Sequence, residues 1–134
     1  MTSVTRLFDF AYDQLQRDPL VKAFNTKKDG NWVSTSSAEF ITQAESVSKA
    51  LIDLGVQAND KIALISMTNR TEWSILDLAV LQIGAQTVPI YPTISQEDYA
   101  YILNHSEAKY CFVSCDEILE KVLAVNSELK FLKE

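Results

Sequence analysis

Hydrophobic and polar positions divide this chain into amphipathic helices and short apolar strands. The clearest helix is predicted over residues 37–54, where apolar residues recur at steps of four, three, four and three from Phe40 onward. Both of its ends carry the expected chemistry. Ser36 and Glu39 have the spacing of a capping box, and Gly55 can adopt the left-handed conformation that ends a helix. This helix is therefore the best-delimited element of the predicted fold.

The other elements alternate between strand and helix. Strands are predicted where short apolar runs lie between turn residues, and helices where the apolar period lengthens. The predicted helices cover residues 4–16, 69–83, 95–103 and 116–125, and the predicted strands cover residues 20–27, 31–35, 61–66, 86–91, 109–114 and 129–132. This order predicts an α/β fold with a mostly parallel sheet and helices on both faces, plus a short N-terminal antiparallel hairpin.

Two local patterns add detail to this scheme. Asn69 and Glu72 have the spacing of a second capping box, which predicts that Asn69 caps the helix over residues 69–83. Pro89 has no N–H to donate to a neighbouring strand, so its strand is expected to lie at an edge of the sheet or to leave the sheet at that point. No repeat or Ser/Gly-rich linker interrupts the chain, and residues 1–134 are expected to form a single subdomain.

The composition is that of a globular protein, with 47% hydrophobic and 22% charged residues among 134. Disordered, collagen-like and coiled-coil classes are therefore disfavoured. The net charge is −6, and residues 68–134 carry five basic and ten acidic side chains. An acidic surface repels polyanions, so nucleic acid is not expected as a partner.

Cys111 and Cys115 are the only cysteines, and both fall in or next to an apolar run that is typical of a strand. Four residues along a strand span about 13 Å, which is too far for a local disulfide. No companion ligands for a metal lie nearby in sequence, so no metal site is expected. Two free thiols, and a charged N-terminus that does not resemble a signal peptide, favour a cytoplasmic location.

Four segments together resemble one enzyme family. They are WVSTSSAEF (32–40), LIDLGVQANDKIALIS (51–66), NRTEWSILDLAVLQIGAQTVPIYPT (69–93) and YAYILNHSEAKYCFV (99–113). In this order and spacing they are similar to the N-terminal region of the adenylate-forming enzymes, specifically the long-chain fatty-acid-CoA ligases. Asn59 stands where that family usually has glycine, a mild departure because asparagine tolerates the left-handed conformation.

The resemblance implies a parent enzyme that activates a fatty acid with ATP and passes the acyl group to coenzyme A. It implies ATP, Mg²⁺ and coenzyme A as cofactors of that full-length enzyme, and none bound by this fragment. The partner would be the remainder of the parent enzyme, which we expect to be cytoplasmic, with a peripheral membrane position left open. A fragment of this kind is expected to be inactive alone and to self-associate through apolar surface that its neighbours normally cover.

No catalytic residue is assigned within the chain. A triphosphate calls for a glycine-rich loop with a nearby cation, whereas the three glycines here are isolated. The candidates for a contact with substrate or with a neighbouring subdomain are Arg70, Glu72 and Trp73, at a strand-to-helix turn where α/β proteins often bind ligands. A structural ion pair between Arg70 and Glu72, with Trp73 as a core anchor, is the other interpretation. The alternative function is a stand-alone, non-catalytic α/β domain that binds a protein partner.

Overall fold

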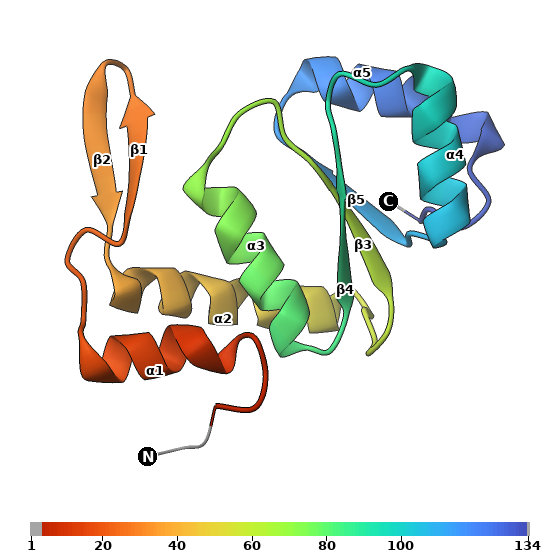
Figure 1. Cartoon of the computed structure of the whole chain (residues 1–134). Coiled ribbons are helices and arrows are strands. Elements are labelled where there is room, and N and C mark those ends of the chain that lie inside the picture. The colour runs from red at the N-terminus through yellow and green to blue at the C-terminus, as the bar shows by residue number, and fades with distance from the viewer. Residues whose placement is uncertain (1–3, 134) are drawn as a thin grey trace. The chain divides into compact units, whose positions relative to one another are not determined.

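The computed structural model describes residues 4–133 (Figure 1). They form two compact units, which are named here by their main elements. The helical unit comprises the chain up to residue 56 together with residues 70–83, and the sheet unit comprises residues 57–69 and the chain from residue 84 onward. The two segments of each unit are thus separated in sequence by a segment of the other.

The helical unit contains three helices and a hairpin. Its elements are α1 (Asp9–Arg17), β1 (Phe24–Lys28), β2 (Asn31–Thr35), α2 (Ser37–Asp53) and α3 (Thr71–Gln82). The predicted hairpin is confirmed, with β1 and β2 paired antiparallel from Phe24 opposite Thr35 to Lys28 opposite Asn31. Its first strand begins later than the predicted residue 20.

The first helix also begins later than predicted, at Asp9 and not at residue 4. The carboxylate of Asp9 accepts hydrogen bonds from the backbone N–H groups of Thr5 and Arg6, at 3.1 and 2.9 Å. Arg6 also donates to Asp9 through its guanidinium, at 2.8 Å. These bonds fold residues 5 and 6 over the start of α1, so they cannot continue the helix.

The chemistry predicted at the ends of α2 is confirmed. Ser36 Oγ accepts from the backbone N–H of Glu39 at 3.2 Å, while Glu39 Oε2 accepts from the backbone N–H of Ser36 at 2.8 Å. At the other end, Gly55 lies in the left-handed region with φ of 84°. A reciprocal cap and a left-handed terminator together fix the length of this helix.

The capping box predicted for α3 is wrong. The helix begins at Thr71 with Arg70, not Asn69, as its N-cap residue, and no side chain caps it. The physical reason is that the helix begins at Thr71, so Glu72 is its second residue and not the third that a capping box requires, and its carboxylate pairs with the guanidinium of Arg70.

A small core holds the helical unit together. Ala44 of α2 packs with Ile75 and Leu78 of α3, and all three are buried. Half-buried side chains surround this core, among them those of Phe8, Ala11, Phe40 and Val47. The hairpin joins the unit through Phe24, whose ring centre lies 4.5 Å from that of Phe40. Apolar packing between its helices, and between α2 and the hairpin, therefore stabilises the helical unit.

The sheet unit contains a parallel three-stranded sheet. Its elements are β3 (Lys61–Ile65), β4 (Gln86–Ile90), α4 (Gln96–Ser106), β5 (Tyr110–Val113), α5 (Asp116–Ala124) and a single 3₁₀ turn, η1 (Asn126–Glu128). The strand order is β4-β3-β5, with both pairs parallel. The prediction for Pro89 is confirmed, because β4 lies at an edge and pairs only on its β3 side within the described sheet.

The strand predicted over residues 129–132 is wrong, because that segment is irregular. The side chain of Asn104 in α4 explains the difference. Its amide nitrogen donates to the carbonyl of Glu128 at 2.9 Å, and its amide oxygen accepts from the N–H of Lys130 at 2.9 Å. A side chain from a distant helix thus takes the backbone groups that a ladder would use.

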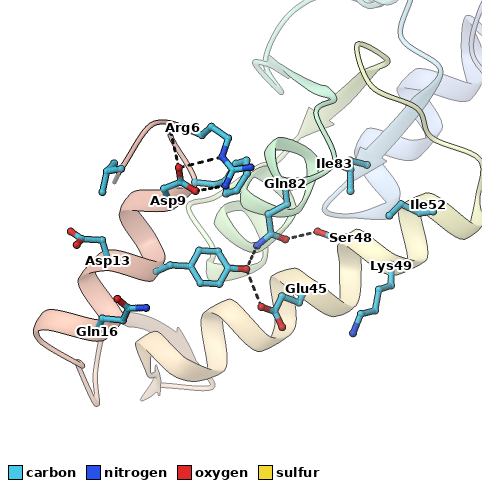
Figure 2. A pocket seen from close by; sticks show the side chains of 13 residues that line it. Arg6, Asp9, Asp13, Gln16, Glu45, Ser48, Lys49, Ile52, Gln82 and Ile83 are labelled. Atoms are coloured by element: carbon cyan, nitrogen blue, oxygen red, sulfur yellow. Dashed lines mark hydrogen bonds and ion pairs between the residues drawn. The ribbon is translucent and has the colours of Figure 1, made fainter. Parts of the chain in front are cut away.

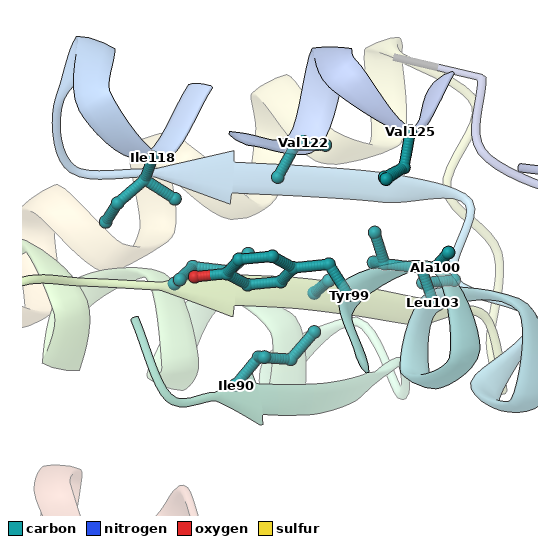
Figure 3. Close-up of a cluster of buried hydrophobic side chains, with 10 residues drawn as sticks. Ile90, Tyr99, Ala100, Leu103, Ile118, Val122 and Val125 are labelled. Atoms are coloured by element: carbon teal, nitrogen blue, oxygen red, sulfur yellow. The ribbon is translucent and has the colours of Figure 1, made fainter. Parts of the chain in front are cut away.

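Helices α4 and α5 pack against one face of this sheet (Figure 3). Between sheet and helices lies a buried cluster that includes Ala63, Ile65, Ile90, Tyr99, Ala100, Leu103, Ile118, Val122 and Val125. The predicted fold class is confirmed: an α/β chain with a parallel sheet, helices packed against it and an N-terminal antiparallel hairpin. Asn59 has φ of 69°, as expected for asparagine in place of glycine.

Candidate functional site

The three residues singled out in the sequence lie together at the start of α3. Arg70 Nη2 is 3.1 Å from Glu72 Oε1, and Arg70 Nε donates to Glu72 Oε2 at 3.3 Å. This hydrogen-bonded pair lowers the pKa of Glu72. The side chains of Arg70 and Glu72 are 38% and 64% exposed, and Trp73 is half-buried. The pair is therefore a surface ion pair, and a contact with substrate or a neighbouring subdomain stays a prediction.

A pocket of about 580 Å³ lies among α1, α2 and α3, where no sequence motif predicts one (Figure 2). A chain of polar side chains crosses it. Gln82 Nε2 donates to the phenol oxygen of Tyr12 at 2.9 Å, and the Tyr12 hydroxyl donates to Glu45 Oε1 at 2.9 Å. The hydroxyl of Ser48 completes the chain through contacts with Gln82 Oε1 and the carbonyl of Ala79.

This polar chain suits a structural role better than a catalytic one. Burial, and then the hydrogen bond to Glu45, raise the pKa of Tyr12 to about 12, so its phenol stays protonated at neutral pH. A phenol that stays protonated cannot accept a proton as a general base. Each of these side chains is also hydrogen-bonded to one from a different helix. No sequence motif signals it, since its members come from three helices.

Polar groups also gather where the parallel strands of the sheet unit end, the edge at which α/β proteins commonly bind ligands. Ser114 Oγ accepts from the N–H of Met67 at 3.0 Å, and the Tyr99 hydroxyl donates to the carbonyl of Pro92 at 3.0 Å. Both bonds hold the loops that follow the strands. Tyr91, directly after β4, is 80% exposed.

The residues described here do not fit a triphosphate. Gly30 lies in the hairpin turn, Gly55 follows α2 and Gly84 follows α3, each with positive φ and each isolated from the others. A phosphate cradle needs several successive backbone N–H groups pointing at one anion. Residues 4–133 also contain no group of three or more His, Cys, Asp or Glu placed to hold a metal ion.

Comparison with known proteins places this fold in a family. Residues 11–133 match the family described as AMP-binding enzyme. The chain belongs to this family. Two curated members are similar to it: the long-chain-fatty-acid–CoA ligase FadD15 of Mycobacterium bovis, 37% identical over 123 residues, and the long-chain-fatty-acid–CoA ligase ACSBG2 of Xenopus laevis, 29% identical over 111 residues.

The matches cover most of this chain but a small part of its relatives. They span 92% of the chain and 20% of FadD15, and 83% of the chain and 15% of ACSBG2. The aligned part is the N-terminal portion of these ligases. Among solved structures, the anthranilate CoA ligase AuaEII in complex with anthranoyl-AMP superimposes with a TM-score of 0.81 over 97% of the chain and 24% of that protein. At 20% identity, this likeness shows the fold alone.

The elements carry no signature of a membrane span. Within the described range, no helix combines the length and the apolar character that crossing a bilayer requires.

Proposed function

We propose that this chain is the N-terminal α/β segment of an ATP-dependent long-chain fatty-acid-CoA ligase, and that it supplies scaffold and not catalytic groups. The observation that carries the proposal is the 37% identity with FadD15 across 92% of the chain but only 20% of that enzyme. The family implies ATP use by the full-length proteins. Mg²⁺ and coenzyme A follow from the ligase reaction and are part of the proposal.

The polar side chains described above support a scaffold role. The Arg70–Glu72 pair, the Tyr12–Glu45 bond and the Ser114 contact are each satisfied within the chain. Groups that stabilise developing charge on a phosphate or an acyl carbon must point at the reacting atoms and not at one another. Such groups would come from the remaining part of the ligase.

A chimera tests this role directly. The segment of M. bovis FadD15 matched by this chain is replaced with the chain, and acyl-CoA formation and ATP–pyrophosphate exchange are measured with a long-chain fatty acid. We expect the chimera to be active and the isolated chain to show no exchange. Clear turnover by the isolated chain would contradict the inactive-fragment part of the proposal. An inactive or insoluble chimera, beside active FadD15, would contradict the ligase assignment itself.

A further inference from the structure

The crossover between β4 and β5 determines the side of the sheet on which a following strand is added. The chain leaves β4, crosses the sheet as α4 and returns as β5 on the far side of β3. Helices α4 and α5 lie on the same face, because Tyr99 and Leu103 of α4 and Ile118 and Val122 of α5 share one buried cluster (Figure 3). Both the direction of the crossover from β4 to β5 and the face of the sheet on which its helix α4 lies are therefore known.

Handedness then places the strand that follows α5. Crossovers between parallel strands are right-handed in about 98% of cases. A crossover through α5, on the same face as α4, must move in the same direction as the crossover through α4. That direction leads from β4 past β3 and β5 to the outer edge of β5, where no strand pairs within residues 57–69 and 84–133.

The segment after α5 already returns to this edge. The N–H of Lys133 donates to the carbonyl of Lys109 at 2.8 Å, and Lys109 directly precedes β5. The Asn104 side chain holds the preceding residues in place through Glu128 and Lys130. A strand that starts at this point begins beside the amino end of β5 and runs parallel to it.

Helix α5 carries an apolar stripe above the same edge. Leu119 and Leu123 are 41% and 58% exposed, and each follows a residue that faces the sheet, Ile118 or Val122. Because α5 is right-handed and runs back over the sheet, a residue 100° further round lies on the flank toward the outer side of β5. That flank would be solvent-exposed without a neighbour.

The opposite flank of α5 faces α4. Burial raises the pKa of Tyr99 in α4, and the charges of Lys121 and Glu117 also act on this pKa. Lys121 and Glu117 are paired with each other at 2.9 Å. The charged flank is thus directed toward the neighbouring helix, while the leucine flank is directed away from it.

We propose that the outer edge of β5, together with Leu119 and Leu123, docks the next parallel strand and the segment after it from the remainder of the ligase. The inference rests on the proposed function. A ligase offers ample chain for this, since the present residues match about 20% of FadD15. A second copy fits less well, because two-fold pairing of identical edges aligns the two strands antiparallel, whereas the return of Lys133 sets a parallel direction.

The same FadD15 chimera tests this docking surface by hydrogen exchange. Amides of residues 110–113 that exchange rapidly in the isolated chain are expected to become protected by about a hundredfold or more in the chimera. The double substitution Leu119→Ser with Leu123→Ser is expected to lower chimera activity at least about tenfold, since it removes two buried leucine contacts. Thermal unfolding of the isolated chain should be nearly unaffected by it. Tyr101→Ser, on exposed α4 surface, is the matched control and should leave activity unchanged.

The outcomes separate the two proposals. An active chimera whose residues 110–113 exchange as fast as in the isolated chain overturns the docking inference and leaves the ligase assignment standing. An active chimera that tolerates both serine substitutions also overturns it. A chimera that is inactive or fails to accumulate, beside active FadD15, contradicts the ligase assignment on which the inference rests. Protection of residues 110–113 in the isolated chain at the same low concentration at which the chimera is measured would point instead to a second copy as the occupant.

Discussion

Lys109 and Asp60 form an ion pair that joins the amino ends of two neighbouring strands. Lys109 Nζ lies 2.6 Å from Asp60 Oδ1, and the Asp60 side chain is only 10% exposed. Asp60 directly precedes β3 and Lys109 directly precedes β5. Asp60 also accepts from the backbone N–H of Gln57 at 3.0 Å, so one carboxylate fixes both a turn and the pairing of two strands.

Replacing Asp60 with Asn is expected to lower the free energy of unfolding by about 1–2 kcal/mol, because it removes the charge that Lys109 and the turn require. Burial acts to raise the pKa of Asp60, but the hydrogen bonds from Lys109 and Gln57 outweigh it and the pKa is lowered. The stabilisation is therefore complete above the unfolded-state pKa of about 3.9 and is lost as pH falls through the lower folded value.

Urea unfolding of the wild type and of Asp60→Asn at a series of pH values measures this effect. The gap between the two proteins should be widest near neutral pH and should narrow below about pH 4. Asp53→Asn is the control, since Asp53 is exposed at the end of α2 and should change stability little. An Asp60→Asn gap that stays constant down to low pH would exclude the ion pair as its source.

The reciprocal cap of α2 gives a second prediction. Ser36→Ala removes the oxygen that accepts from the Glu39 N–H, and should destabilise the chain by about 1 kcal/mol. Ser46→Ala is a control in the middle of the same helix, where alanine is a better helix former. The denaturant midpoint of Ser36→Ala should fall below that of the wild type, whereas the midpoint of Ser46→Ala should not. Equal midpoints would mean that packing, and not the cap, fixes the start of α2.

Local chemistry was predictable from the sequence where one or two neighbouring residues decide it. The Ser36–Glu39 cap, the turn at Gly55 and the edge position of Pro89 all depend on the residue's own geometry or on partners three positions away. These features need no knowledge of the rest of the fold. The α/β class followed from the order of such elements.

Features decided by distant partners were not predictable. Asn69 and Glu72 have the spacing of a capping box, but the helix begins one residue later and Glu72 forms an ion pair with Arg70. Residues 129–132 have the sequence pattern of a strand, but the Asn104 side chain hydrogen-bonds to the carbonyl of Glu128 and to the N–H of Lys130. The pocket among α1, α2 and α3 was missed for the same reason, because its polar chain links residues far apart in sequence and leaves no motif.

The Tyr12 phenol joins all three helices of the helical unit through Glu45 and Gln82, which makes it a sensitive test of this packing. Tyr12→Phe should cost about 1 kcal/mol through the lost hydrogen bonds. The pKa of Tyr12 is raised to about 12, so its contribution is complete below the unfolded value of about 10 and is lost as pH rises between the two.

Alkaline titration followed by phenolate absorbance checks this prediction, with the Tyr12→Phe curve subtracted from that of the wild type. The difference should titrate near pH 12, well above an ordinary tyrosine. Tyr91→Phe is the matched control, since Tyr91 is 80% exposed and its substitution should leave stability unchanged. A difference curve centred near pH 10 would show that Tyr12 is not held between Glu45 and Gln82.

The isolated chain is expected to self-associate or to become poorly soluble at high concentration. Apolar side chains that a ligase would cover are exposed here, among them Leu119 and Leu123 beside the open edge of β5. Exposed apolar surface next to an unpaired strand edge favours contacts between copies. Sedimentation velocity over a concentration series should show growing oligomers, and Leu119→Ser with Leu123→Ser should reduce them more than Tyr101→Ser does. A strictly monomeric species at all concentrations would instead support a stand-alone domain whose exposed surface needs no cover.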